Sequence, residues 1–316
     1  MTKKFNWLVA GIGDIARKRV IPAIHAEPRS ELYGLVSRNP KTVQGFGVKI
    51  WSDFEAALSD PAIDLVYVAT PVVFHAPQTI AALRAGKHVL CEKPTAMNYA
   101  EAVEMQRVAE ETGRTLGIAY YRRMYPKVQR AKELIAAGVI GTPAIAELTS
   151  HDWVPPEPVE RGWRFHRAIA GGGPLYDIAS HRLDLLNYFF GKPLRVSGHL
   201  SNLVHQTEVE DNATVMVEYD SGVRGIVDVR WHSRVPRDEF RIRGTEGEID
   251  LTPLNGSALV YPGGKENIPA PANLHYPCIE NFVSAVTGQA ELASSGATSL
   301  PTGWITQQAL DWYHKG

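Results

Sequence analysis

The sequence predicts an α/β protein with an N-terminal doubly wound parallel sheet and a C-terminal α+β domain that contains a large open, mainly antiparallel sheet. The chain has 316 residues, more than one hydrophobic core usually serves, so we expect two domains. The first 120 residues alternate short apolar runs with helical patterns, which is typical of a parallel sheet. Long alternating segments follow, which indicate an antiparallel sheet. The predicted domains span residues 1–121 and 122–316.

The predicted strands of the first domain are short apolar runs. They cover residues 5–10, 32–36, 65–69, 88–91 and 115–119. The sequence predicts helices between them at residues 54–58, 77–84 and 99–111. The crossovers should be right-handed. Pro22 lies inside the first crossover, where we expect it to kink the helix or to delay its start.

The second domain begins with a predicted helix over residues 126–137. Apolar residues then alternate with polar ones over residues 213–219 and 223–231, on either side of Ser221-Gly222, which predicts a β-hairpin. The sheet should extend through residues 240–251. The last two helices are predicted at residues 278–286 and 304–313.

The composition points to a small-molecule ligand. Lys plus Arg number 33 and Asp plus Glu number 34, so there is no basic surplus to attract nucleic acid or an anionic membrane. No apolar run reaches the roughly 20 residues of a membrane-spanning helix. Cys91 and Cys278 lie far apart and the N-terminus has no cleavage-site pattern, so we expect a soluble protein of the reducing cytoplasm.

A glycine-rich pattern, Gly11-Ile12-Gly13-Asp14-Ile15-Ala16, directly follows the first predicted strand. In a Rossmann unit this position binds the pyrophosphate of a dinucleotide. The first glycine allows the tight turn, the second lets backbone N–H groups approach the phosphates, and a small third residue lets the helix pack closely on the strand. The predicted cofactor-binding residues of this loop are Gly11, Gly13, Asp14, Ile15 and Ala16.

The second predicted strand ends in Ser37-Arg38-Asn39, without the Asp or Glu that an NAD enzyme presents to the ribose hydroxyls. Ser37 can donate a hydrogen bond to a 2′-phosphate, and Arg38 can pair with that phosphate or stack on adenine. The alternative is an arginine in a solvated turn. We therefore expect a preference for NADP, with NAD possible.

The predicted strand over residues 88–91 ends in Cys91-Glu92-Lys93-Pro94. This is the carboxyl edge of the sheet, where open α/β sheets bind ligands. A residue before proline is biased to an extended conformation, which keeps Lys93 out of a helix. Its ammonium can then reach a substrate oxygen and polarise a carbonyl. The alternative, a surface pair between Glu92 and Lys93, contributes less than roughly 1 kcal/mol.

A triple glycine at residues 171–173 leads into a predicted helix that carries Asp177, His181 and Asp184. In an α-helix these three positions share a face, so the Asp177 carboxylate can orient the His181 imidazole for proton transfer. We interpret the glycines as a flexible, hinge-like approach to this helix. Two alternatives stay open: a helix cap with a surface imidazole, or a metal site that these three residues form with His151-Asp152.

The pattern at Gly11, the Glu92-Lys93-Pro94 element and the helix with Asp177 and His181 together resemble the Gfo/Idh/MocA oxidoreductase family over nearly the whole chain. The resemblance implies a Rossmann domain, a C-terminal domain whose open sheet often serves for oligomerisation, and hydride transfer on sugar or polyol carbons. It implies that Lys93, Asp177 and His181 are catalytic and that no metal is used. Asp184 then becomes a structural partner. We expect a homodimer or homotetramer and a sugar-like substrate.

The resemblance also implies further cofactor-binding residues. Thr70, Pro71 and His75 match the family's loop beside the nicotinamide, although Val72 stands where an asparagine is common. Glu92 and Lys93 complete this set.

The substrate is expected to contact the second domain. Tyr121, Arg122 and Arg123 match an aromatic and basic stretch of the family, and Trp163-Arg164 match an element ahead of the triple glycine, where Ala179 replaces a glycine usual in the family. Aromatic rings and polar side chains can stack on a sugar or bond to it. The predicted substrate-binding residues are Tyr121, Arg122, Trp163, Arg164 and His275, with Trp153 and Tyr276 as further candidates.

A rival prediction from another class is a regulator that senses a nucleotide without catalysis. It predicts a degraded set of proton-transfer residues. The sequence retains Lys93, Asp177 and His181, which favours the enzyme.

Overall fold

The structure is a computed structural model that describes residues 4–156 and 159–315. Its internal contacts divide the chain into two compact units. The first contains Met1–Tyr121 and Pro271–Leu300, and the second contains Arg122–Ala270 and Pro301–Gly316. The segment Pro271–Leu300 therefore belongs to the first unit, whereas the sequence predicted one unbroken second domain over residues 122–316.

This late segment joins the first unit because the apolar side of α8 (Tyr276–Val286) is buried there. Ile279, Phe282 and Val283 are fully buried, and the Phe282 ring centroid lies 5.7 Å from that of Trp7 in the first strand. Each such side chain stabilises the fold by about 1.5–3 kcal/mol when it leaves water. The burial of α8 thus brings residues far along the chain onto the N-terminal sheet.

The first unit contains a six-stranded sheet in the order β3-β2-β1-β4-β5-β6, and all its pairings are parallel. The strands are β1 Phe5–Ala10, β2 Ser30–Val36, β3 Lys49–Trp51, β4 Leu65–Val68, β5 His88–Cys91 and β6 Leu116–Ile118. The order reverses between β1 and β4, and doubly wound sheets bind ligands at the carboxyl ends of the strands at such a switch point. The predicted doubly wound sheet is confirmed, and β3 is an edge strand that the sequence did not predict.

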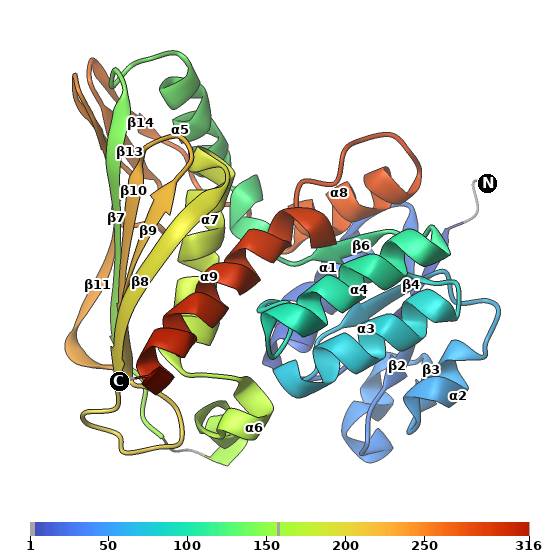
Figure 1. The fold of residues 1–316 in the computed structure, drawn as a ribbon. Coiled ribbons are helices and arrows are strands. Elements are labelled where there is room, and N and C mark those ends of the chain that lie inside the picture. Colours follow the sequence, from blue (N-terminus) through green and yellow to red (C-terminus); the bar gives the residue numbers. More distant parts are fainter. Residues whose placement is uncertain (1–3, 157–158, 316) are drawn as a thin grey trace. The chain divides into compact units, whose positions relative to one another are not determined.

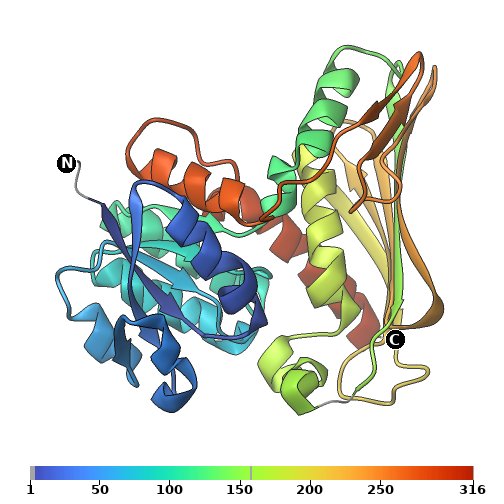
Figure 2. The same cartoon turned by 180° about the vertical axis from the view of Figure 1, so that it is seen from behind.

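Helices cover both faces of this sheet. Figures 1 and 2, seen from opposite sides, show α3 (His75–Arg84) and α4 (Tyr99–Thr112) on one face and α1 (Ile21–Ala26) with α8 on the other. The short α2 (Phe54–Leu58) follows β3. All residues of β4 are buried, because the helices exclude water from both of its faces.

The first crossover is helical from Asp14, contains a π-helical turn over Ala16–Val20 and continues directly into α1. The N–H of Ile21 donates to the carbonyl of Ala16, and Pro22 falls in the first turn of α1, where its missing N–H is tolerated. The regular α-helix around Pro22 thus follows a π-helical turn, and the helical conformation itself starts earlier, at Asp14.

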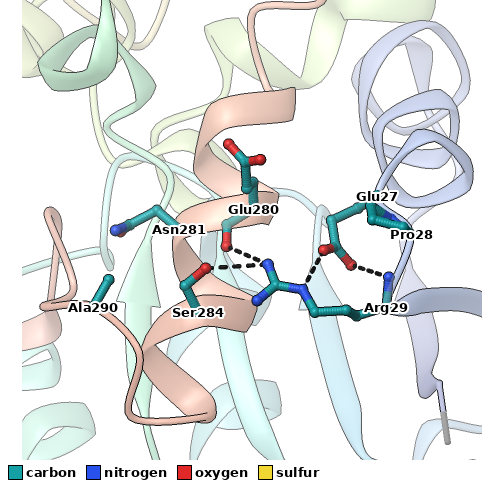
Figure 3. A pocket seen from close by; sticks show the side chains of 7 residues that line it. All are labelled: Glu27, Pro28, Arg29, Glu280, Asn281, Ser284 and Ala290. Atoms are coloured by element: carbon teal, nitrogen blue, oxygen red, sulfur yellow. Dashed lines mark hydrogen bonds and ion pairs between the residues drawn. The ribbon is translucent and has the colours of Figure 1, made fainter. Parts of the chain in front are cut away.

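Arg29, just ahead of β2, connects the N-terminal part of the first unit to α8 (Figure 3). Its guanidinium donates to the Glu27 carboxylate at 2.6 Å, to the Ser284 hydroxyl at 3.1 Å and to the Glu280 carbonyl at 3.2 Å. These residues line a pocket of about 450 Å³ together with Pro28, Asn281 and Ala290. Because the guanidinium already bonds to neighbours in its own unit, we assign this pocket a structural role.

The second unit contains an eight-stranded sheet in the order β14-β13-β12-β11-β7-β10-β9-β8. Its strands are β7 Pro143–Trp153, β8 Pro193–Ser201, β9 Asn212–Tyr219, β10 Arg224–Arg230, β11 His232–Gly244, β12 Glu248–Asp250, β13 Ala258–Tyr261 and β14 Gly264–Asn267. Every pairing is antiparallel except that of β7 with β10. The predicted open, mainly antiparallel sheet is confirmed, and the predicted hairpin is β9 with β10.

Helices lie on one face of this sheet: α5 (Pro126–Ala136), α7 (Ser180–Phe190) and the last part of α9 (Gly296–Lys315), as Figure 1 shows. The short α6 (Arg167–Ala170) precedes α7 in the chain. Along β9, Ala213, Val215 and Val217 are fully buried, whereas the alternate residues Thr214 and Met216 are exposed. The sheet thus has a covered and an open face.

Across the part of the chain that the structure describes, no helix combines the length and the apolar character needed to cross a membrane.

Candidate active site

The loop after β1 has the shape that a dinucleotide phosphate requires. Gly11 has a φ of +88°, and a Cβ there would come within 2.5 Å of the Ala69 carbonyl, so a side chain is excluded. A Cβ on Gly13 would meet nothing within 4 Å, so that stretch of backbone faces open space. Ala16 is fully buried. The residues present therefore fit a bound pyrophosphate, with N–H groups at the start of a helix to face it.

The other predicted residues of this loop are exposed. Asp14 forms an ion pair with Lys18 at 3.3 Å, and Ile15 is 40% exposed. Arg17, which the sequence analysis missed, donates from Nε to the Ile12 carbonyl at 3.3 Å, and its guanidinium lies 5.4 Å from the Phe46 ring centroid. The sequence signal that could have pointed to Arg17 is its position one turn after Gly13, where a cation lies beside the glycine-rich loop.

The end of β2 has no acidic side chain. Arg38 is exposed, and the Ser37 hydroxyl lies 3.1 Å from the Asn39 carbonyl oxygen and 3.3 Å from its nitrogen. These short-range bonds hold the turn, and the N–H of Ser37 donates to the Trp51 carbonyl at 3.0 Å. The turn thus presents a hydroxyl and a guanidinium at the place where the second strand ends.

Glu92 is held inside the first unit. Its carboxylate accepts hydrogen bonds from the Tyr67 hydroxyl at 2.7 Å and from the Lys93 N–H at 3.2 Å, and it lies 3.0 Å from His275 Nε2. Burial alone would raise the pKa of Glu92, but the bonds with His275 and Tyr67 outweigh it and the pKa is lowered. An ionised, fully engaged carboxylate anchors the start of the Lys93 loop.

His75 joins two loops at the carboxyl edge of the sheet. Its Nδ1 lies 2.8 Å from the Pro94 carbonyl and its Nε2 lies 2.9 Å from the Thr70 carbonyl. Burial lowers the pKa of His75, which favours the neutral ring, and a neutral ring donates only one of these two bonds. The Thr70 hydroxyl donates to Gln78 at 2.8 Å. The structure therefore brings Thr70, Pro71, His75 and Lys93 into one neighbourhood, where the Lys93-Pro94 peptide is cis.

Two of the predicted substrate residues in the first unit also belong to this neighbourhood. His275 is only 1% exposed, and its ring centroid lies 4.5 Å from that of Tyr121. The His275 imidazole is therefore engaged by Glu92 and Tyr121 in the interior. Arg122 belongs to the second unit, where it is buried and donates to Asn255. Trp163 and Arg164, like Arg122, belong to the second unit.

The triple glycine is a packed turn. All three glycines are buried. Gly171 has a φ of +83°, and a Cβ there would come within 2.5 Å of the Tyr176 ring. A Cβ on Gly173 would come within 2.0 Å of the Glu210 carbonyl oxygen. The prediction of a flexible, hinge-like approach is wrong, because each glycine is required by close contacts.

Asp177 and His181 lie on either side of a change in helix type. A π-helical turn covers Leu175–Ala179, and α7 begins at Ser180. The α-helical spacing that we used to align Asp177, His181 and Asp184 therefore does not hold through the first of these positions. His181 is buried, whereas the Asp177 side chain is 27% exposed.

Asp177 has a partner that the sequence did not predict. Arg164 donates from one terminal nitrogen to the Asp177 carboxylate at 3.1 Å, and its guanidinium lies 5.7 Å from the Trp163 ring centroid. The structure thus brings the predicted residues Trp163, Arg164 and Asp177 together in the second unit. A fixed carboxylate beside a cation can orient a substrate hydroxyl or a neighbouring imidazole.

Asp184 is paired with Arg123 in the interior of the second unit. It is buried and accepts two bonds from Arg123, at 2.8 and 2.5 Å, with Thr302 at 3.5 Å. Burial raises the pKa of Asp184, and the Arg123 charge opposes that rise. Its structural role agrees with the reading of the sequence, and Arg123 is the partner.

Two of the candidate ligands of the alternative metal site have other partners. His151 Nε2 lies 2.7 Å from Asp228, and Asp184 is taken by Arg123. Within residues 4–156 and 159–315, no group of three or more His, Cys, Asp or Glu side chains could hold a metal ion.

A cavity of about 360 Å³ opens in the second unit beside the π-helical turn. Polar side chains dominate its wall, and Ile178 contributes the position next to Asp177. Arg182 from α7 donates to Asp238 at 3.0 Å and to Ser150 at 3.2 Å. The lining residues are Ser150, His151, Asp152, Ile178, Pro236, Arg237, Asp238 and Asn255.

Comparison with known proteins places these features in a family. Residues 5–120 match an oxidoreductase family with an NAD-binding Rossmann fold, and residues 128–250 match the GFO/IDH/MocA C-terminal domain. The chain is 33% identical over 322 residues to the 1,5-anhydro-D-fructose reductase of Ensifer adhaerens, with 96% of each protein covered.

Solved structures are similar over nearly the whole chain. The aldose-aldose oxidoreductase of Caulobacter crescentus, in complex with glycerol, has a TM-score of 0.89 and 25% identity, covering 99% of this chain and 98% of that one. A levoglucosan dehydrogenase in complex with NADH and levoglucosan has the same TM-score, identity and coverage. The two family matches and the relative of 33% identity show that this chain belongs to the GFO/IDH/MocA family of oxidoreductases and is a nicotinamide-dependent enzyme of hydride transfer.

Proposed function

We propose that this enzyme is an NADP-preferring dehydrogenase or reductase that acts on a CH–OH or carbonyl carbon of a sugar, a polyol or a related small molecule. The observation that carries the proposal is the open backbone at Gly13 on the same sheet edge as Lys93, in a chain of this family. The sugar class is supported by the relatives, which are named as a reductase of 1,5-anhydro-D-fructose and a dehydrogenase of levoglucosan.

The cofactor preference rests on the turn after β2. Ser37 and Arg38 offer a hydroxyl and a guanidinium, and an acidic side chain that would repel a 2′-phosphate is absent from the sequence of this turn. Titration of the protein with NADPH and NADH tests the proposal. We expect tighter binding of NADPH and a loss of that preference in Arg38→Ala. Tighter binding of NADH would contradict it.

The proposed catalytic residues are Lys93, Asp177 and His181. A bound nicotinamide supplies or accepts the hydride. In the oxidation direction His181 takes the hydroxyl proton, Asp177 orients the imidazole and stabilises its charge, and the Lys93 ammonium stabilises the developing alkoxide oxygen. Reduction uses the same residues in reverse. Arg164 fixes the Asp177 carboxylate.

For the substrate we propose that Trp163 and Arg164 contact its polar groups and that Tyr121, Arg122 and His275 shape the pocket. Their aromatic and cationic side chains suit a hydroxylated ligand. A panel of sugars, polyols, ketoses and dihydrodiols, followed by nicotinamide absorbance with NADP and NADPH, tests the substrate class. Turnover of a member of this panel supports the proposal, and a silent panel favours the regulator.

We further propose a homodimer or homotetramer formed through the open face of the eight-stranded sheet, in the cytoplasm. The open face of that sheet supports the first part, and two buried cysteine thiols whose pKa values are raised by burial are compatible with a reducing compartment. Sedimentation equilibrium of the purified protein tests the oligomer, and a monomer would contradict it.

A further inference from the structure

Glu210 is a buried acid next to the turn that carries Asp177. It lies two residues ahead of β9, which begins at Asn212, and is only 3% exposed. Its Oε1 accepts hydrogen bonds from the N–H of Gly173 at 2.9 Å and from the N–H of Leu175 at 3.0 Å. Its own backbone N–H also bonds to the carboxyl group. One carboxylate thus meets the backbone of the turn from which the π-helical segment starts.

These bonds complete the start of the helical segment. The first N–H groups of a helix have no acceptor within the helix. Pro174 has no N–H, and the flanking N–H groups of Gly173 and Leu175 both reach Glu210. The N–H groups of Tyr176 and Asp177 close back on the Gly173 carbonyl at 3.1 and 3.0 Å. From Gly173 to Asp177, every backbone N–H group of the chain therefore has an acceptor.

Backbone hydrogen bonds also hold the chain next to Glu210 in place. The neighbouring residue Asp211 lies just ahead of β9 and is held by two backbone bonds: its N–H donates to the Ser201 carbonyl at 3.0 Å, and its carbonyl accepts from the N–H of Trp231 at 2.8 Å. Close packing adds to this, because the Glu210 carbonyl lies where a Cβ of Gly173 would be. The segment that leads into β9 and the turn before Asp177 are thus held together by side-chain hydrogen bonds and by backbone packing.

The charged groups around Glu210 are otherwise engaged. Glu208 accepts from the Arg167 N–H at 3.1 Å and contacts His166, and the Asp211 carboxylate turns to the N–H groups of residues 203–205. The Arg167 charge favours the ionised form of Glu210. Burying a carboxylate is unfavourable unless its bonds are satisfied, so a backbone-bonded acid at this position calls for a specific role.

We propose that Glu210 is a positioning residue of the active site: it fixes the Gly173–Leu175 turn and through it the orientation of Asp177 and His181. The inference rests on the proposed catalytic role of that pair. Glu210 itself has no contact with the reacting atoms in this account. Its effect is on turnover, because a displacement of about 1 Å in a catalytic group can reduce a rate by roughly 100-fold.

Three variants test the proposal: Glu210→Ala removes the acceptor, Glu210→Gln keeps an acceptor oxygen, and Glu208→Gln changes the exposed neighbouring acid as a control. We expect kcat to fall about 10- to 100-fold in Glu210→Ala and to recover to within about 3-fold of the parent in Glu210→Gln. The Kd for NADPH should stay within about 2-fold in all three, because the phosphate loop lies in the first unit. Glu208→Gln should behave as the parent.

Hydrogen exchange supplies a readout that does not depend on turnover. The amides of Gly173 and Leu175 should be protected in the parent, retained in Glu210→Gln and fast in Glu210→Ala. If Glu210→Ala does not fold, the exchange rates of the Gly173 and Leu175 amides in the parent and in Glu210→Gln still test the proposal. Fast exchange of both in the parent, or a parent-like kcat in a folded Glu210→Ala, would overturn the proposal. A parent-like kcat in His181→Ala would instead refute the catalytic assignment of His181. The exchange rates of the Gly173 and Leu175 amides would still test the bonds to Glu210.

Discussion

The guanidinium of Arg164 lies 3.1 Å from the carboxylate of Asp177, and both side chains are about a quarter exposed, at 28% and 27%. The carboxylate that we assign to catalysis is therefore already oriented by a cation from the segment ahead of the triple glycine. A charge-assisted bond of this kind restricts the rotamer of the acid more than it stabilises the fold, because part of the pair faces solvent.

Loss of Arg164 should therefore reduce catalysis more than stability. We expect Arg164→Ala to lower kcat/KM by about 10-fold or more, because Asp177 loses the bond that orients it. Arg164→Lys should recover part of the loss, since an ammonium retains the charge without the planar geometry. Arg195→Ala, at an arginine whose side chain is 83% exposed, is the matched control. Unchanged kinetics in Arg164→Ala would show that the pair is only a surface contact.

The two glycines of the phosphate loop should respond differently to alanine. Gly13→Ala should fold with an unchanged melting temperature, because its Cβ meets no protein atom, yet it should weaken NADPH binding by about 10-fold or more as the Cβ enters the space for the phosphates. Gly11→Ala should lose stability, because its φ of +88° and the contact with Ala69 exclude a side chain. Fluorescence titration and thermal melts check both. Normal NADPH affinity in Gly13→Ala would contradict the assigned pyrophosphate position.

An acid introduced at the end of β2 should change the cofactor preference. In Ser37→Asp the new carboxylate would repel a 2′-phosphate and accept from ribose hydroxyls, so we expect NADPH affinity to fall about 10- to 100-fold while NADH affinity is kept or improved. Arg84→Ala, on the exposed side of α3, is the control. An equal loss of both cofactors would mean that the turn does not meet the ribose.

Glu210 should make stability depend on pH. Burial raises the pKa of Glu210 from its ordinary value near 4.5 to about 7, although the Gly173 and Leu175 N–H groups and the Arg167 charge oppose the rise. The folded protein thus holds this proton more tightly than the unfolded chain, so the contribution to stability is present below about pH 4.5 and is lost as the pH rises through about 7.

Glu210→Gln removes this titration. Between pH 5 and pH 8 the parent should lose roughly 2–3 kcal/mol of unfolding free energy that the variant keeps. The melting temperature of the variant relative to the parent should therefore increase from pH 5 to pH 8, and differential scanning calorimetry at the two values measures it. A difference that is the same at both values would show that the acid does not titrate in this range.

Local signals in the sequence predicted most of the architecture. The strands of the first unit and the β9–β10 hairpin follow from apolar runs and alternation, which the burial of the strands explains. In the loop after β1 the turn requires Gly11, because its positive φ and the Ala69 carbonyl exclude a side chain, and the sequence shows this glycine directly after the first predicted strand. Strand β3 has only three residues, none of them fully buried, so it carries no such pattern and was missed.

Other features depend on contacts that a linear pattern does not contain. The periodicity of α8 indicates an apolar face, but it does not say that the face is buried against Trp7 rather than in the second unit. Helix α9 starts at Gly296, earlier than predicted, and continues through Pro301, although a proline inside a helix usually interrupts it.

The sequence did not predict the local geometry around Asp177, because it does not show the π-helical turn. Five residues at Leu175–Ala179 are too few to distinguish a π-helical turn from an α-helix, so the face shared by Asp177 and His181 was inferred from the wrong spacing. The bond between Arg164 and Asp177 spans 13 residues, and the bonds from Glu210 reach the turn from a distant strand. Such pairings arise from tertiary packing.

The most direct test of the account is the turnover of Lys93→Met and His181→Ala on a sugar that the parent converts, together with the Kd of each for NADPH. If these residues handle the proton and the developing charge, kcat should fall by about 10²- to 10⁴-fold in each variant while the Kd stays within about 3-fold of the parent. Parent-like turnover in both variants would contradict the assignment of this chemistry to Lys93 and His181.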